Sequence, residues 1–139
     1  MSNWAPKILG IMRILTGIMF ACHGAQKLFG AFGGIPAGMT PPAWILYGAG
    51  SIEFFGGILI ALGLFTRPIA FLASGTMAVA YFYGHARNGT LPMVVFPKVN
   101  GGEPAVMYCW LFLYISAAGP GAFALDNLIF RRRAEARAY

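Results

Sequence analysis

The sequence predicts an all-α integral membrane protein, a four-helix bundle with both termini in the cytoplasm. The composition, four long apolar runs and the uneven placement of cations lead to this prediction. Of the 139 residues, 58% are hydrophobic and only 10% are charged, whereas soluble globular proteins carry about 25% charged residues. A soluble domain of this size could not cover its large surface with so few polar groups. We therefore expect one transmembrane domain over residues 1–139.

Four stretches are long and apolar enough to cross the hydrocarbon core, which takes about 20 helical residues. They cover residues 8–29, 43–65, 68–85 and 105–123. Loops rich in Gly and Pro are expected over 30–42 and 87–102, and a tight turn is expected at Thr66 and Arg67, where Pro68 suits the first turn of the third helix. A short basic tail over about 125–139 is predicted to lie along the membrane surface.

The cations predict the orientation. Lys and Arg number 10 against 4 Asp and Glu, a net charge of +6. Four crossings put both termini on one side, which then holds Lys7, Arg67 and the arginines at 131, 132, 133 and 137, while Arg87 and Lys98 fall on the other. Because cytoplasmic loops carry the excess of Lys and Arg, the first side is expected in the cytoplasm. The cations flank apolar runs, so lipid headgroups are the expected partners and nucleic acid is not.

Ionisable residues inside the spans define the candidate site, since a charge at membrane depth costs roughly 2.5–3.5 kcal/mol. At a rise of about 1.5 Å per residue, five of them are expected to climb through the outer half of the bundle. These candidate ligand-binding residues are Glu53, His23, Lys27, His85 and Glu103. Arg13 lies deeper on the cytoplasmic side, and its long side chain is expected to reach Glu53 as a structural intramembrane pair.

One stripe on each helix carries small or polar residues, and these stripes are predicted to face the bundle interior. On the first helix the stripe runs through Arg13, Gly17, Gly24 and Lys27. On the fourth helix it comprises Glu103, Met107, Trp110 and Tyr114.

Each candidate also has a plainer explanation. Arg13 and Glu53 could simply neutralise one another, Lys27 could extend to the outer headgroups, and His23 and His85 could be neutral residues between helices. Two histidines at similar depth also permit a haem, but no fixed spacing supports one. The sequence has no phosphate-binding loop, Cys-x-x-Cys or His-Glu-x-x-His motif, so it predicts no metal site and no intrinsic cofactor, and it identifies no catalytic residue.

Several short motifs follow one another in a characteristic order. They are Arg13 with Gly17 and Phe20, then His23-Gly24-x-x-Lys27-Leu28-Phe29-Gly30, Glu53-x-x-Gly56-Gly57, Leu62-Gly63-Leu64-Phe65-Thr66-Arg67, Asn100-Gly101-Gly102-Glu103 and Gly119-Pro120-Gly121-Ala122-Phe123-Ala124-Leu125-Asp126. In this order and spacing the chain resembles the DoxX family of small four-helix membrane proteins over about residues 10–126.

The resemblance implies a multi-pass protein of the bacterial inner membrane. Members of this family are linked to quinone-coupled oxidation, and others join membrane oxidoreductase assemblies with redox partners. Matching motif positions are Arg13, Lys27, Glu53, Arg67 and Glu103, whereas His23 and His85 are candidates on their chemistry alone.

The leading functional hypothesis is a redox-associated, quinone-linked subunit whose polar pocket holds a quinone headgroup. Histidine or lysine would donate to a quinone carbonyl, and a glutamate would accept a proton. No electron carrier is recognised in the sequence, so another membrane or redox subunit would have to supply one. The alternative is a non-catalytic accessory subunit that packs in a larger membrane complex or forms a homo-oligomer. A solute or proton pathway ranks last, because four short helices leave little room for it.

Overall fold

The computed structural model describes residues 3–35, 38, 40–86 and 96–129, and this part of the chain contains helices and no strands. In chain order the elements are α1 (Ala5–Phe29), η1 (Ala31–Gly33), η2 (Trp44–Ala49), α2 (Gly50–Leu62), α3 (Thr66–Val79), η3 (Ala80–His85), α5 (Pro97–Asn100) and α6 (Glu103–Ala118). A last helical turn covers 125–129. The elements η2 and η3 are π-helical. Element η2 continues directly into α2, and α3 continues directly into η3.

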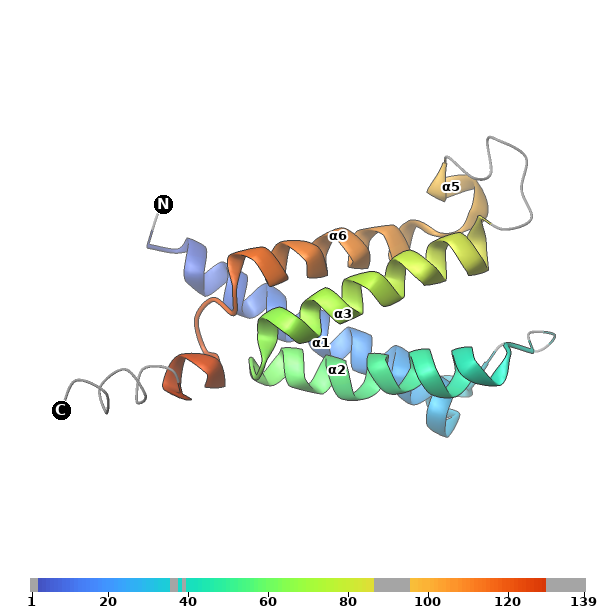
Figure 1. Ribbon diagram of the computed structural model, residues 1–139, viewed down its shortest axis with the longest axis horizontal. Helices are drawn as coiled ribbons and strands as arrows, with labels where there is room; N and C mark the ends of the chain where they lie inside the picture. Colours follow the sequence, from blue (N-terminus) through green and yellow to red (C-terminus); the bar gives the residue numbers. More distant parts are fainter. Residues whose placement is uncertain (1–2, 36–37, 39, 87–95, 130–139) are drawn as a thin grey trace.

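Four long helical segments lie side by side in two pairs (Figure 1). Helix α1 packs mainly on α2 and α3 packs mainly on α6, while α2 also contacts α3. The start of α1, the end of α2, the start of α3 and the end of α6 lie at one end of the molecule, together with the turn at 125–129 (Figure 1). We call this the closed end, and the opposite end, which carries η2, η3 and α5, the open end.

The predicted helix positions agree with these elements, with shifts at their ends. Helix α1 begins three residues before the predicted 8–29, and α6 ends at Ala118 rather than 123 because Gly119 takes a positive φ of 96°. The predicted turn at Thr66 is displaced: Gly63 and Phe65 adopt left-handed conformations, and α3 begins at Thr66 itself. Pro68 then lies in the first turn of α3, as expected. The predicted tail over 125–139 and the loop over 87–102 fall partly outside the described residues.

Glycines set the distance between α1 and α2. A Cβ on Gly57 would lie 2.6 Å from the carbonyl oxygen of Gly17, and one on Gly17 would lie 2.7 Å from that of Gly57. Next along α1, a Cβ on Gly24 would meet the backbone of Phe54 at 2.2 Å. The backbones therefore touch directly, as small residues allow in membrane helix pairs. This confirms the expected contact role of the glycine stripe on the first helix.

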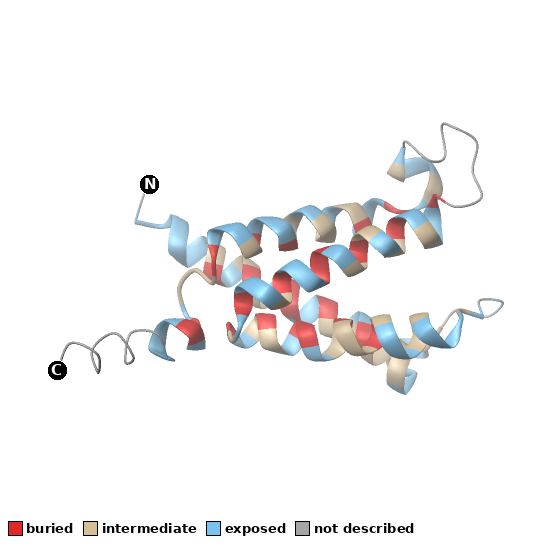
Figure 2. Cartoon of the chain, in the orientation of Figure 1, coloured by how far each residue is buried: buried red, intermediate tan, exposed pale blue. Residues whose placement is uncertain are grey.

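Buried residues lie on the sides of the helices that face one another, and exposed residues lie on the outer sides (Figure 2). Phe20, Ile60 and Phe112 form the centre of the core, yet Arg13 and Glu53 are buried as completely as these apolar residues, at 0% and 1% exposure. Large apolar side chains such as Ile8 and Leu15 point outward. A surface of this kind fits lipid better than water, because lipid does not penalise exposed apolar area.

The described helices include two that are long and apolar enough to cross a membrane, α1 and the continuous segment Trp44–Leu62; α6 is apolar but shorter. The inward face predicted for the fourth helix is wrong. Met107, Trp110 and Tyr114 are exposed, and α6 buries Ala105, Phe112 and Ile115 instead. Trp and Tyr also favour the interface between membrane and water, so an aromatic stripe does not by itself mark the packed face of a helix.

Candidate functional site in the cleft between α2 and α3

Arg13 connects the chain segments that meet at the closed end. Its guanidinium donates to the carbonyl oxygens of Ile60 and Ala61 at 2.5 and 2.6 Å, at the end of α2. It also donates to the carbonyls of Pro120, Ala122 and Phe123 at 2.8, 3.3 and 2.9 Å. The last carbonyls of a helix have no partner within the helix, so Arg13 satisfies them and ties the chain after α6 to α2.

The expected pair of Arg13 and Glu53 is not formed, although both side chains are buried. Arg13 lies 47 residues before Ile60 in sequence and reaches the carbonyl end of α2, whereas Glu53 lies in the first turn of α2. The Arg13 guanidinium donates to backbone carbonyls and not to the carboxylate that the sequence predicts as its partner. This prediction is therefore corrected: Glu53 pairs with Lys27.

Two further contacts complete the closed end. The carboxylate of Asp126 accepts hydrogen bonds from the backbone N–H groups of Phe65 and Thr66, both at 2.8 Å, and so caps the start of α3. Arg67 donates to the carbonyls of Ser116 and Ala117 at 3.1 and 2.7 Å, at the end of α6. The motifs around Arg13, Arg67 and Asp126 are thus explained by architecture.

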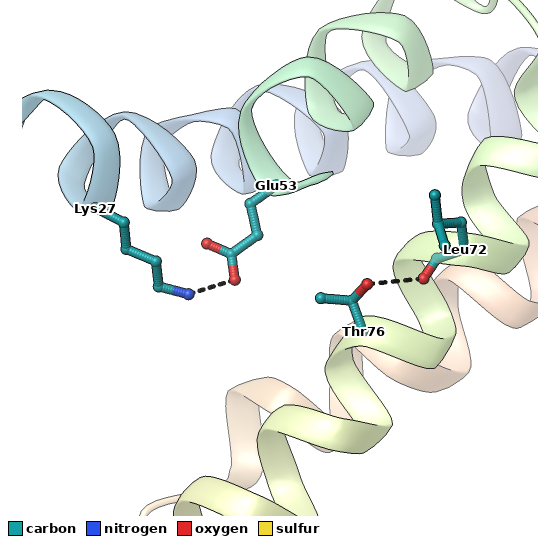
Figure 3. A network of polar contacts seen from close by, with 4 residues as sticks. All are labelled: Lys27, Glu53, Leu72 and Thr76. Carbon is teal, nitrogen blue, oxygen red and sulfur yellow. Dashed lines mark hydrogen bonds and ion pairs between the residues drawn. The ribbon is translucent and has the colours of Figure 1, made fainter. Parts of the chain in front are cut away.

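Lys27 and Glu53 form an ion pair between α1 and α2 (Figure 3). Lys27 comes from the last turn of α1 and keeps 28% of its side chain exposed, whereas the side chain of Glu53 is 1% exposed. Only Oε1 of Glu53 meets the ammonium; Oε2 is buried and has no hydrogen-bond partner among the described residues. A buried carboxylate oxygen without a partner is costly, which marks this pair as a place where a ligand or a proton can be accommodated.

An open cleft of about 1020 Å³ lies beside this pair, between α2 with η2 and α3 with η3. Its walls are mostly apolar and include Ile52, Phe71 and Val79. The polar side chains that line it are Gln26, Lys27, Thr40, Thr76 and His85. In Figure 3 the Lys27 and Glu53 side chains point toward one another, and Thr76 lies apart from them on α3. Ligand sites are typically clefts of roughly 300–1,000 Å³ with apolar walls and a few polar groups, and this cleft matches that description.

Both π-helical segments border the cleft at the open end. Residues of η2 and of η3 line it, and the rings of Trp44 and Tyr83 meet edge to face with centroids 5.0 Å apart. Pro41 and Pro42 of the preceding loop also line it, and the Gln26 side chain holds that loop by donating to the carbonyl of Gly34 at 2.8 Å. Since π-helical turns occur frequently at functional sites, two of them on one cleft strengthen its assignment as the candidate site.

The structure separates the five predicted site residues. Lys27 and His85 line the cleft, and Glu53 joins it through Lys27. His23 is exposed on the other side of α1, with its ring edge to face with Tyr108 at 6.0 Å. Glu103 is exposed at the start of α6 and its nearest described cation is Lys98, at 3.8 Å. His23 and Glu103 therefore lie apart from the cleft.

Sequence reasoning missed Thr76 and Gln26, because neither is charged. Thr76 donates its hydroxyl hydrogen to the carbonyl of Leu72 at 2.9 Å, so its oxygen retains lone pairs that can accept a bond from a ligand. Gly75, which lies in a mostly apolar run, is the sequence feature that could have indicated the α3 side of the cleft. A glycine inside a helix usually has a packing or functional reason.

The cleft offers the Lys27 donor at one side and apolar walls beyond it, and Glu53 is buried next to the cleft as the partner of Lys27. Lys27 can donate to a carbonyl or an anionic oxygen, and Glu53 can accept a proton. Within the described part of the chain, no three His, Cys, Asp or Glu side chains gather as metal ligands.

Comparisons with known proteins agree on one family. The DoxX family model matches residues 8–86. An uncharacterized protein of Haemophilus influenzae is 43% identical, over 95% of this chain and 98% of its own. The inner membrane protein YqjF of Escherichia coli is 28% identical, over 88% of this chain and 92% of its own. "Putative oxidoreductase CatD" of Bacillus subtilis is 27% identical, over 87% and 86%. No solved structure gives a significant match. The chain belongs to the DoxX family.

Proposed function

We propose that this DoxX protein is a redox-associated subunit of the bacterial inner membrane that binds a quinone-type lipid in the cleft between α2 and α3. One observation carries the proposal: an apolar, open cleft leads to the ammonium of Lys27, which is paired with the buried Glu53. A quinone has the same two parts, an apolar tail and a ring with carbonyl oxygens that accept hydrogen bonds.

In this proposal Lys27 donates to a quinone carbonyl, and Glu53, whose Oε2 has no described hydrogen-bond partner, takes one of the two protons that a quinol releases on two-electron oxidation. The two electrons pass to a redox group of a protein partner. His85 lines the cleft from η3, and its Nδ1 faces the carbonyl of Asn100 at 3.1 Å, so its Nε2 can accept the second proton of the quinol. The name of the Bacillus subtilis relative CatD, an oxidoreductase, supports this redox proposal.

The proposed topology has four crossings with both termini in the cytoplasm. The uninterrupted segment of α3 and η3 has 14 and 6 residues, which at about 1.5 Å per residue spans the roughly 30 Å hydrocarbon core. The closed end carries Lys7 and Arg67 together with the start of the arginine-rich tail, so the positive-inside rule puts it in the cytoplasm. The relatives named as inner membrane proteins support the location. The cleft then opens in the outer half of the membrane.

The test is extraction of the protein, purified in mild detergent from bacterial membranes, followed by mass spectrometry for quinones. We expect co-purified quinone in the wild type and at least a tenfold loss in Lys27→Met, because the donor to the ring oxygen is gone. Lys98→Met is the matched control, since the Lys98 side chain is 84% exposed and lies outside the cleft. If the wild type neither carries quinone nor binds added ubiquinone, the non-catalytic accessory subunit becomes the better account.

A further inference from the structure

Seven helical glycines of this chain fall into two contrasting groups. The first group, which includes Gly10, Gly17, Gly24 and Gly57, is required by close backbone contacts, since an added Cβ on each would lie 2.2–2.6 Å from a neighbouring backbone atom. The second group consists of Gly48, Gly75 and Gly84. An added Cβ on any of these three would meet nothing within 4 Å, and none has a positive φ.

No contact within the described chain explains the second group. Glycine destabilises a helix relative to alanine, because it loses more backbone freedom on folding. A helix therefore gains nothing from such a glycine unless the empty space has a use. Gly48 lies in η2, Gly75 in α3 and Gly84 in η3, and all three line the same cleft. The cleft is thus kept open by glycines drawn from both of its walls.

We infer that Gly48, Gly75 and Gly84 form a subsite for the apolar tail of the ligand, so that the protein selects quinones by their tail as well as by their ring. The inference rests on the proposed function and extends it to substrate selection. Gly75 and Gly84 are nine positions apart on one continuous helical segment, which corresponds to roughly 13 Å. That length suits an extended chain lying along α3, with bare backbone on one side and the apolar side chains of α2 on the other.

A flexible chain fits this space better than a helix of a partner protein. A helix with its side chains is about 10–12 Å across, whereas the Trp44 and Tyr83 rings of the two walls contact each other at the open end, which leaves no room for a helix between them. At the other side the Lys27 side chain, which is 28% exposed, favours a polar group. A single polar head joined to a narrow apolar chain satisfies both ends.

The test compares two ligands on the purified full-length protein: a dimethoxy-methyl-benzoquinone ring without a tail, and the same ring with a decyl tail. Gly75→Leu should fill the tail space without a backbone clash. We expect it to reduce the affinity for the decyl form about tenfold or more, because buried apolar contacts are lost, and to change the affinity for the bare ring by less than about twofold. Gly56→Ala is the matched control: its Cβ would make an ordinary 3.4 Å contact with Ile69, outside the cleft, so both affinities should stay as in the wild type.

A second variant reports on the glycines without a ligand. Gly75→Ala should raise the melting temperature of the ligand-free protein, since alanine favours the helix and meets no neighbour. A lower melting temperature would show that Gly75 serves packing, and an unchanged preference for the tailed quinone in Gly75→Leu would equally overturn the inference while leaving the ring site intact. If the wild type binds neither quinone, the proposed function itself fails.

Discussion

Replacing Arg13 should remove most of the stability of the closed end. The guanidinium donates five hydrogen bonds, to the carbonyls of Ile60 and Ala61 in α2 and to three carbonyls in the segment after α6. Arg13→Met keeps the apolar stem but removes all five of these bonds, although the carbonyl of Ile60 keeps the N–H of Gly63 at 3.0 Å. Hydrogen bonds to charged groups are worth about 1.5–3 kcal/mol each, and neutral ones about 1 kcal/mol. Even at the lower figure the five bonds amount to about 5 kcal/mol, a large part of the 5–15 kcal/mol typical of a whole domain.

Arg13→Lys gives a graded comparison. An ammonium has three donors against five in a guanidinium and cannot fork across two segments, so about two of the five bonds should be lost and the destabilisation should be intermediate. The assay is reversible unfolding in mixed micelles, followed by tryptophan fluorescence. Lys98→Met serves as control, because its exposed pair with Glu103 at 3.8 Å is worth roughly 0–1 kcal/mol. If Arg13→Met lies within about 1 kcal/mol of the wild type, the role assigned to Arg13 is wrong.

Three further predictions follow from individual contacts. Gly57→Ala should lower the unfolding free energy by about 1–3 kcal/mol in the same assay, because its Cβ would lie 2.6 Å from the Gly17 carbonyl oxygen; an unchanged value would contradict direct backbone contact. Asp126→Ala should cost about 1 kcal/mol and speed hydrogen exchange at the start of α3, since it removes the cap; unchanged exchange there would refute the cap. Lys27→Met should lower the unfolding free energy by about 3–5 kcal/mol, because it leaves the Glu53 carboxylate buried without its partner. Adding Glu53→Gln to this variant should recover much of the loss. If the effects of the two single changes simply add, the pair is not coupled.

The sequence predicts helices well here because apolar runs and Gly/Pro breaks act locally. All four predicted spans correspond to helical segments, and the stripe through Gly17 and Gly24 on the first helix does meet the second helix. The ends shift where a single backbone conformation decides them, as at Gly63 and Phe65, whose positive φ angles set the turn before α3. Composition alone does not predict a positive φ at a phenylalanine such as Phe65.

The hydrogen-bond and ion-pair partners of the buried side chains were harder to predict from the sequence than their burial. Arg13 and Glu53 are both buried, yet helical depth does not say that backbone carbonyls, rather than a carboxylate, receive the guanidinium. Lys27 could reach outward to headgroups or inward to Glu53, and only the packed structure shows that it does the second. His23 and Glu103 share a similar depth with Lys27 in sequence terms but point elsewhere, because depth along a helix does not fix direction around it.

The pattern of charged residues in the sequence does not predict the cleft. It depends on glycines at 48, 75 and 84, on the π-helical turns that contain two of them, and on Trp44 meeting Tyr83 across it. These are long-range arrangements between α2 and α3, which periodicity within one helix cannot describe.

Photolabelling with an azido-quinone tests the central claim most directly, namely that the cleft between α2 and α3 holds a quinone-type ligand. The labelled wild-type protein would be digested, and the modified peptides identified by mass spectrometry, with excess unlabelled quinone as competitor. We predict competable label on the cleft walls, in the segments that contain Ile52 and Thr76, and its loss in Lys27→Met but not in Lys98→Met. Label that spreads over the exposed face of α6 around Met107 and Trp110, and that excess quinone does not displace, would contradict the account.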